Sequence, residues 1–140
     1  MFSSPLSVKV IALWYFVASF LTFRTRSSDA LVLGYYVSGR WAAIHNLILL
    51  VFLLALGIGL WLRRNLTRKV AIGYEGYLLL NELLALVIPS SRAYRIALIN
   101  QVGVEPPLTA EWVLTLTAVP EVLFASFIIW FLVTRKSAFI

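Results

Sequence analysis

The sequence predicts an all-α integral membrane protein, a four-transmembrane-helix bundle in which residues 1–140 form a single transmembrane domain. Of the 140 residues, 61% are hydrophobic and only 13% are charged. A soluble domain is usually about 45–50% apolar and about 25% charged, and a small one has too little volume to hide more apolar surface. Four apolar segments contain most of the additional hydrophobic residues. The length of each segment is close to the roughly 20 residues that cross a bilayer. We therefore expect the chain to lie in lipid.

The first two predicted spans carry few polar residues. The first, residues 6–23, is short, and the stem of Lys9 lets its ammonium group reach the interface. No basic segment precedes this span and no small-residue cleavage site follows it, so we expect a retained helix rather than a signal peptide. The second, residues 41–62, is interrupted only by His45 and Asn46.

The other two spans, residues 70–89 and 112–133, carry acids. Glu75 and Glu82 lie in the third span and Glu121 lies in the fourth. On insertion scales a central acid costs about 2.5–3.5 kcal/mol, whereas a Leu, Ile or Val returns only about 0.3–0.6 kcal/mol. The third span is therefore marginal by itself and needs neighbouring helices.

Basic residues predict the orientation of the spans. A basic loop of Arg63, Arg64, Arg68 and Lys69 joins spans two and three, and further basic residues follow span four. Positive charge marks the cytoplasmic side of a membrane protein. We expect this loop and both termini to be cytoplasmic, in a bacterial inner membrane.

The two loops on the opposite side are longer. We expect residues 30–37, which are apolar and aromatic, to lie at the headgroup level or to lengthen span two. Residues 91–102 are expected to form an interfacial helix that is capped by Ser91 and stopped by Gly103. Thr109 is expected to cap span four.

An intramembrane polar cluster is the first candidate for a functional site. At about 1.5 Å per residue, the ionisable members fall at comparable depths in the outer half of the bilayer. The cluster consists of His45, Asn46, Asn81, Glu82 and Glu121. Such groups are functional suspects by default, because lipid cannot satisfy them. Two interpretations stay open, namely polar contacts that hold the helices together and a path for protons or ions.

Other chemistry is less well supported by the residue types. His45 is a possible axial ligand to a tetrapyrrole, but bis-histidine ligation needs two histidines and the chain has one. Glu75 is expected to form an interfacial ion pair with Arg68 of the basic loop, which lies seven residues earlier in the chain. The sequence has no cysteine and no repeated ligand spacing, so we predict no metal centre. The net charge of +6 is divided among the span ends, which argues against nucleic-acid binding.

The leading functional hypothesis is a non-catalytic accessory or interaction subunit of a larger membrane complex, in contact with lipid, pigment or quinone. The alternative is a small oligomeric proton-coupled transporter that uses Glu82 and Glu121. An enzyme acting on a lipid or quinone is a third possibility. The expected partners are the lipid bilayer and other membrane subunits or further copies of the chain.

Overall fold

The computed structural model describes residues 5–101 and 109–140. Four helices are long and apolar enough to span a membrane: α1 (Pro5–Arg24), α2 (Gly39–Trp61), α3 (Asn65–Val87) and α5 (Ala110–Thr134). The shorter elements are strand β1 (Ala30–Val32), strand β2 (Tyr35–Val37), helix α4 (Pro89–Gln101) and the 3-10 helix η1 (Lys136–Ala138). The prediction of an all-α membrane bundle is confirmed, with one small β-hairpin added to it.

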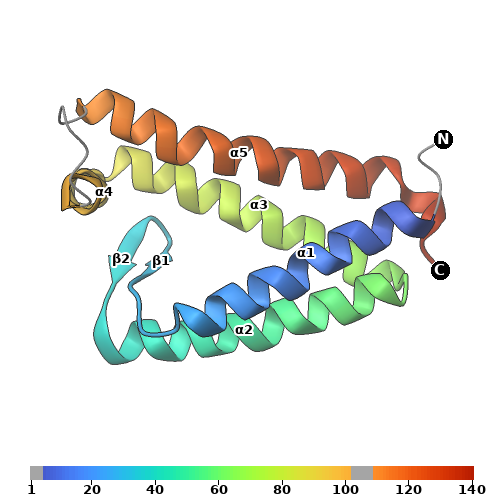
Figure 1. Cartoon of the computed structure of the whole chain (residues 1–140). Coiled ribbons are helices and arrows are strands. Elements are labelled where there is room, and N and C mark those ends of the chain that lie inside the picture. Colours follow the sequence, from blue (N-terminus) through green and yellow to red (C-terminus); the bar gives the residue numbers. More distant parts are fainter. Residues whose placement is uncertain (1–4, 102–108) are drawn as a thin grey trace.

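The long helices form two pairs, α1 with α2 and α3 with α5. Figure 1 shows the two pairs close together where α1 begins and α5 ends, and further apart at the opposite end, where α4 and the hairpin lie. Below, these are called the terminal end and the hairpin end. The buried apolar core joins both pairs toward the terminal end, and its largest side chains are Tyr15, Leu60, Ile128 and Leu132.

The terminal end is closed by the last residues of the chain. The backbone N–H of Ile140 donates to the carbonyl of Arg63, and the N–H of Asn65 donates to the carbonyl of Ile140. Nε of Arg63 also donates to the carbonyl of Ala138 over 2.5 Å. The predicted basic loop therefore packs against the C-terminal segment.

The third span begins earlier than the hydropathy predicts, at Asn65 rather than at residue 70. Arg68 and Lys69, expected in the loop, lie in the first turns of α3. The guanidinium of Arg68 is buried, and it donates to the carbonyl of Leu132 over 3.1 Å and to the side chain of Asn65. A charged residue can start this helix because α5 supplies an acceptor for it.

Residues 30–37 do not lengthen span two, because they form an antiparallel hairpin and α2 begins at Gly39. Ala30 pairs with Val37 and Val32 pairs with Tyr35, and the turn between the strands is Leu33-Gly34. Both turn residues have positive φ, 49° and 80°. Two such residues give the primed turn whose twist matches that of the strands.

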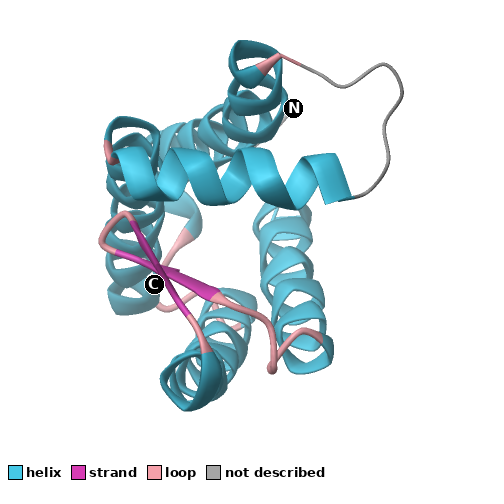
Figure 2. Ribbon diagram, turned by 90° about the vertical axis from the view of Figure 1, so that its left-hand side faces the viewer, coloured by secondary structure: helices cyan, strands magenta, loops and turns pink. Residues whose placement is uncertain are grey.

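Helix α4 lies across the hairpin end of the bundle (Figure 2). It begins at Pro89, which suits the first turn of a helix because its missing N–H would have no partner there. The predicted cap, Ser91, lies inside the helix, and its hydroxyl donates to the carbonyl of Gly34 instead. The predicted stop at Gly103 lies outside the described residues. Thr109 caps α5 as predicted, accepting from the N–H of Trp112.

Candidate functional site

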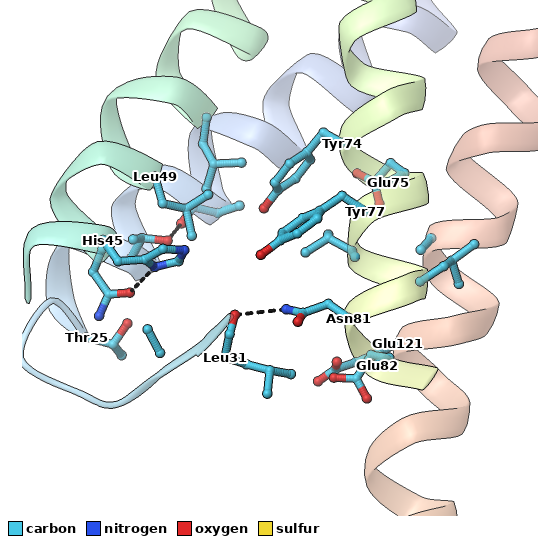
Figure 3. Close-up of a pocket in the computed structure, with 18 of the residues that line it drawn as sticks. Thr25, Leu31, His45, Leu49, Tyr74, Glu75, Tyr77, Asn81, Glu82 and Glu121 are labelled. Atoms are coloured by element: carbon cyan, nitrogen blue, oxygen red, sulfur yellow. Dashed lines mark hydrogen bonds between the residues drawn. The ribbon is translucent and has the colours of Figure 1, made fainter. Parts of the chain in front are cut away.

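A cavity of about 490 Å³ lies between the two helix pairs, in the half of the bundle next to the hairpin. All four long helices, the hairpin and α4 contribute to its wall. The wall combines aromatic rings with an unusual number of polar groups for a membrane interior (Figure 3). Its ionisable side chains apart from the tyrosines are Asp29, His45, Glu75, Glu82, Arg95 and Glu121.

The inner end of the cavity is closed by a hydrogen bond between the two helix pairs. The hydroxyl of Tyr15 on α1 donates to Oε1 of Glu75 on α3 over 2.5 Å. Both residues are buried, with exposed fractions of 1% and 2%. The ring of Tyr74 packs beside this contact, 5.3 Å from the ring of Phe52. The predicted pairing of Glu75 with Arg68 is therefore wrong, since a tyrosine hydroxyl satisfies this carboxyl group.

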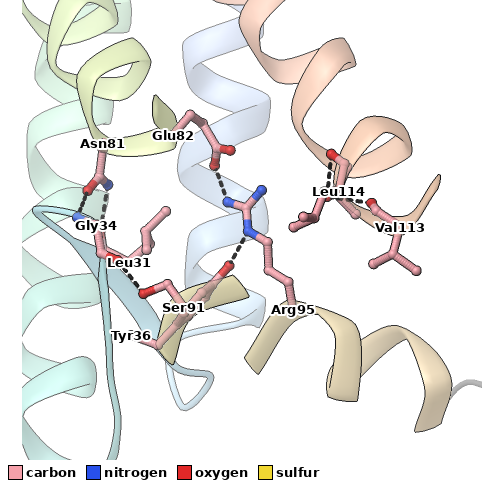
Figure 4. A network of polar contacts seen from close by, with 10 residues as sticks. Leu31, Gly34, Tyr36, Asn81, Glu82, Ser91, Arg95, Val113 and Leu114 are labelled. Carbon is pink, nitrogen blue, oxygen red and sulfur yellow. Dashed lines mark hydrogen bonds and ion pairs between the residues drawn. The ribbon is translucent and has the colours of Figure 1, made fainter. Parts of the chain in front are cut away.

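The hairpin is fastened to the cavity wall by the side-chain amide of Asn81. Its Oδ1 accepts from the N–H of Gly34 over 2.7 Å, and its Nδ2 donates to the carbonyl of Leu31 over 2.8 Å (Figure 4). Backbone groups that are buried away from water need hydrogen-bond partners within the protein. Asn81 supplies them, so this amide holds the hairpin against α3.

A buried ion pair joins α4 to α3. Nη2 of Arg95 lies 2.5 Å from Oε1 of Glu82, and the two side chains are 6% and 7% exposed. Nε of Arg95 donates to the hydroxyl of Tyr36 over 2.8 Å, which ties the hairpin into the same network (Figure 4). The second carboxylate oxygen of Glu82 and Nη1 of Arg95 are buried without a hydrogen-bond partner.

The electrostatics of α4 and the hairpin follow from these contacts. Burial lowers the pKa of Arg95, but the bond and charge of Glu82 raise it more, so the pKa lies above its ordinary value and the guanidinium stays charged. Burial raises the pKa of Tyr36, although Arg95 opposes this shift. At the rim, Tyr94 donates to the carboxylate of Asp29, and this hydrogen bond raises the pKa of Tyr94 to about 12.

The five residues of the predicted polar cluster lie on two sides of the cavity. Glu82 and Glu121 come from α3 and α5, and their carboxyl groups lie next to each other (Figure 3). His45 lies on α2 across the cavity, with Nδ1 3.4 Å from Oδ1 of Asn46. The amide of Asn46 donates to the carbonyl of Ser28 over 2.9 Å and so holds the end of the α1–hairpin loop. A tetrapyrrole role for His45 stays a prediction.

Two members of the site were missed from the sequence. Arg95 falls within the predicted interfacial helix of residues 91–102, and in the structure it is the partner of Glu82. One signal was present, because Ser91 and Arg95 are four residues apart and share a helix face, and these are the two buried residues of α4. Tyr15 lies inside an apolar run and gives no signal of its own.

The fold and the cavity define an integral membrane four-helix bundle with a polar cavity under a hairpin and a crossing helix. Among the side chains that the structure describes, no three His, Asp or Glu residues are arranged to hold a metal ion. Neither a model of a known protein family nor a curated protein nor a solved structure matches the chain.

Proposed function

We propose that the protein is a small proton-coupled transporter in which Glu82 and Glu121 hold either a proton or a positively charged substrate. The observation that carries the proposal is the second carboxylate oxygen of Glu82. It is buried and has no hydrogen-bond partner, and it belongs to a carboxyl group that lies beside Glu121 on the wall of a cavity.

Counting charges explains why such a site would couple protons to a substrate. Arg95 compensates the carboxylate of Glu82, so an ionised Glu121 leaves one negative charge uncompensated. An unpaired charge within a membrane span is costly, and two neighbouring carboxylates repel each other. A proton on Glu121 or a bound cation removes this charge equally well. Because one replaces the other, binding of the cation releases the proton.

The arrangement of helices supports the same function. The two helix pairs are packed more extensively within each pair than with each other. The cavity lies in the half of the bundle in which the two pairs diverge. Rocking of two such halves around a central site is a common means of alternating access.

Proteoliposomes that contain a trapped pH-sensitive dye test the proposal. Outward proton movement should follow the external addition of at least one class of cation, and Glu121→Gln should slow it about tenfold or more, since the amide cannot exchange a proton. Glu75→Gln is the matched control, because the amide oxygen still accepts from Tyr15. Permeant amines can cross the bilayer without a transporter and change the internal pH. For these compounds, the rate of proton movement is therefore taken as the difference between wild-type and Glu121→Gln vesicles. Equal rates in wild-type and Glu121→Gln vesicles for every cation would exclude the proposal.

We also propose that the terminal end faces the cytoplasm of a bacterial inner membrane, on the basis of its basic residues. The chain has no cysteine, so introduced cysteines are unique labelling sites. The exposed positions Arg64→Cys and Lys136→Cys should react with an impermeant maleimide in inside-out vesicles. Arg92→Cys and Asn100→Cys should react in intact spheroplasts. The reverse pattern would invert the orientation, and labelling of all four positions from one side would overturn the four-span topology.

A second candidate function is a non-catalytic accessory subunit of a larger membrane complex. Gly73 and Gly76 favour it, because both are exposed on α3 and a Cβ atom at either position would meet nothing within 4 Å. Small residues on a helix face allow another transmembrane helix to approach closely. That helix would come from another subunit or from a second copy of the chain. Co-purification of discrete partners in mild detergent would favour this function.

A further inference from the structure

We infer that the cation bound between Glu82 and Glu121 is a protonated organic amine with an apolar body, rather than an inorganic ion. This inference rests on the proposed transport function and names its substrate class. It depends on three observations, which concern the size of the cavity, the unpartnered carboxylate oxygen of Glu82 and the aromatic wall.

The cavity has the size of an organic ligand. Its volume of about 490 Å³ falls within the roughly 300–1,000 Å³ that is usual for small-molecule sites. An inorganic cation needs several oxygen ligands that converge on one point. Among the described residues, the acids and the histidine form no such group of three. The two carboxyl groups therefore lie at one wall of a space that is much larger than a hydrated ion requires.

The free acceptor calls for an N–H donor. The unpartnered oxygen of Glu82 is buried, and Glu82 as a whole is 5% exposed. A buried acceptor gains most from a charged donor, because the hydrogen bond and the Coulomb attraction then act together. A primary ammonium group has three N–H donors and can reach both carboxyl groups at once. A quaternary ammonium group has the charge but no donor, so it would leave this oxygen unsatisfied.

The rest of the wall suits an apolar body. Trp14 on α1 and Phe124 on α5 line the cavity, and their rings meet edge-on with centroids 4.7 Å apart. Both are partly exposed, 40% and 42%, so they lie where the cavity meets the outer surface of the bundle. Tyr74 and Tyr77 of α3 also line the cavity. Aromatic faces attract both apolar groups and cations. An amphipathic amine that partitions into the bilayer would reach the cavity between α1 and α5.

Calorimetric titration of the purified protein with a matched series of ligands tests the inference. The series is tryptamine, its neutral analogue tryptophol, its N,N,N-trimethyl derivative and sodium chloride. Tryptamine should bind at least about tenfold more tightly than tryptophol or the quaternary analogue, as expected for a charge-assisted hydrogen bond. Titrations in buffers of different ionisation enthalpy should show that tryptamine binding releases about one proton.

Two variants assign the effect to the proposed atoms. Glu121→Gln changes an exposed side chain without altering its shape, and it should remove both the preference for tryptamine and the proton release. Glu75→Gln makes the same chemical change in a cavity-lining carboxyl group that already has a partner, and it should keep the preference for tryptamine over tryptophol that Glu121→Gln removes. Equal binding of tryptamine and tryptophol, or no effect of Glu121→Gln, would overturn the inference.

The outcomes separate this inference from the proposed function. If sodium displaces a proton and tryptamine does not, the amine specificity is wrong and proton coupling stands. If tryptamine binds with the predicted preference but no cation moves protons in proteoliposomes, the ligand class stands and the transport function is wrong.

Discussion

Arg95→Met is expected to lower the free energy of unfolding by about 3–5 kcal/mol, because the substitution leaves the buried carboxylate of Glu82 without its charge partner. Arg95 and Glu82 are 6% and 5% exposed, so solvent does little to compensate either charge. The hydroxyl of Tyr36 loses its donor in the same variant. Thermal unfolding in one detergent, followed by intrinsic fluorescence, measures the loss. Arg92→Met is the matched control on the same helix, since Arg92 is exposed, and it should change stability by about 0.5 kcal/mol or less.

The double variant Arg95→Met/Glu82→Leu separates a structural role of this pair from a functional one. Apolar residues in place of a buried ion pair are often neutral or stabilising. The double variant should therefore recover most of the stability that Arg95→Met loses. It should still fail to bind a cation or move protons, because the free carboxylate oxygen is gone. Equal, small losses for Arg95→Met and Arg92→Met would show that the pair contributes little to the fold.

Hydropathy predicted the four membrane spans because each span sums contributions from some twenty residues, and a single polar residue changes that sum little. The largest error was at the start of α3, and it has a specific cause. Arg68 looks like a loop residue when its charge is counted as exposed, whereas in the structure the carbonyl of Leu132 accepts from its guanidinium. The sequence does not reveal that acceptor, because it lies 64 residues away.

The hairpin was missed for a local reason. Its strands have three residues each, which is too short for an alternating pattern to be recognised. Its turn is Leu33-Gly34, with a leucine at φ 49° where Asn or Asp would give the usual signal. The hairpin holds this turn through contacts with Asn81 and Ser91, which come from α3 and α4. Tertiary contacts therefore decide the local structure of this segment.

The candidate site was partly predictable. The cost of burying acids indicated that Glu82 and Glu121 would avoid lipid, and the structure places both on the cavity wall. Their partners were not predictable in the same way. The pairing of Glu82 with Arg95 depends on the direction in which α4 leaves α3 at Pro89, and the contact of Tyr15 with Glu75 depends on how the two helix pairs meet. A hydropathy pattern encodes neither the direction of α4 nor the packing of the two helix pairs against each other.

Gly34→Ala is expected to be the most damaging change in the hairpin, because two separate penalties apply there. Gly34 has φ 80°, and a left-handed backbone costs an L-residue about 1–2 kcal/mol. A Cβ atom at this position would also lie 2.5 Å from Cβ of Leu84 and 3.0 Å from its backbone carbonyl carbon. Overpacking of this kind usually costs about 1–3 kcal/mol more. Since a helix backbone cannot yield locally, we expect the hairpin to move away from α3.

Gly39→Ala is the matched control for the backbone penalty alone. Gly39 has φ 66°, and a Cβ atom there would meet nothing within 4 Å, so only the backbone cost of about 1–2 kcal/mol applies. Displacement of the hairpin should break the hydrogen bond from the N–H of residue 34 to Asn81. Amide hydrogen exchange across residues 30–37 should therefore be faster in Gly34→Ala and almost unchanged in Gly39→Ala. The opposite outcome is an equal loss of stability in both variants together with slow amide exchange across residues 30–37 in both. That result would show that close packing of Gly34 against Leu84 does not hold the hairpin, and that its hydrogen bonds to Asn81 do.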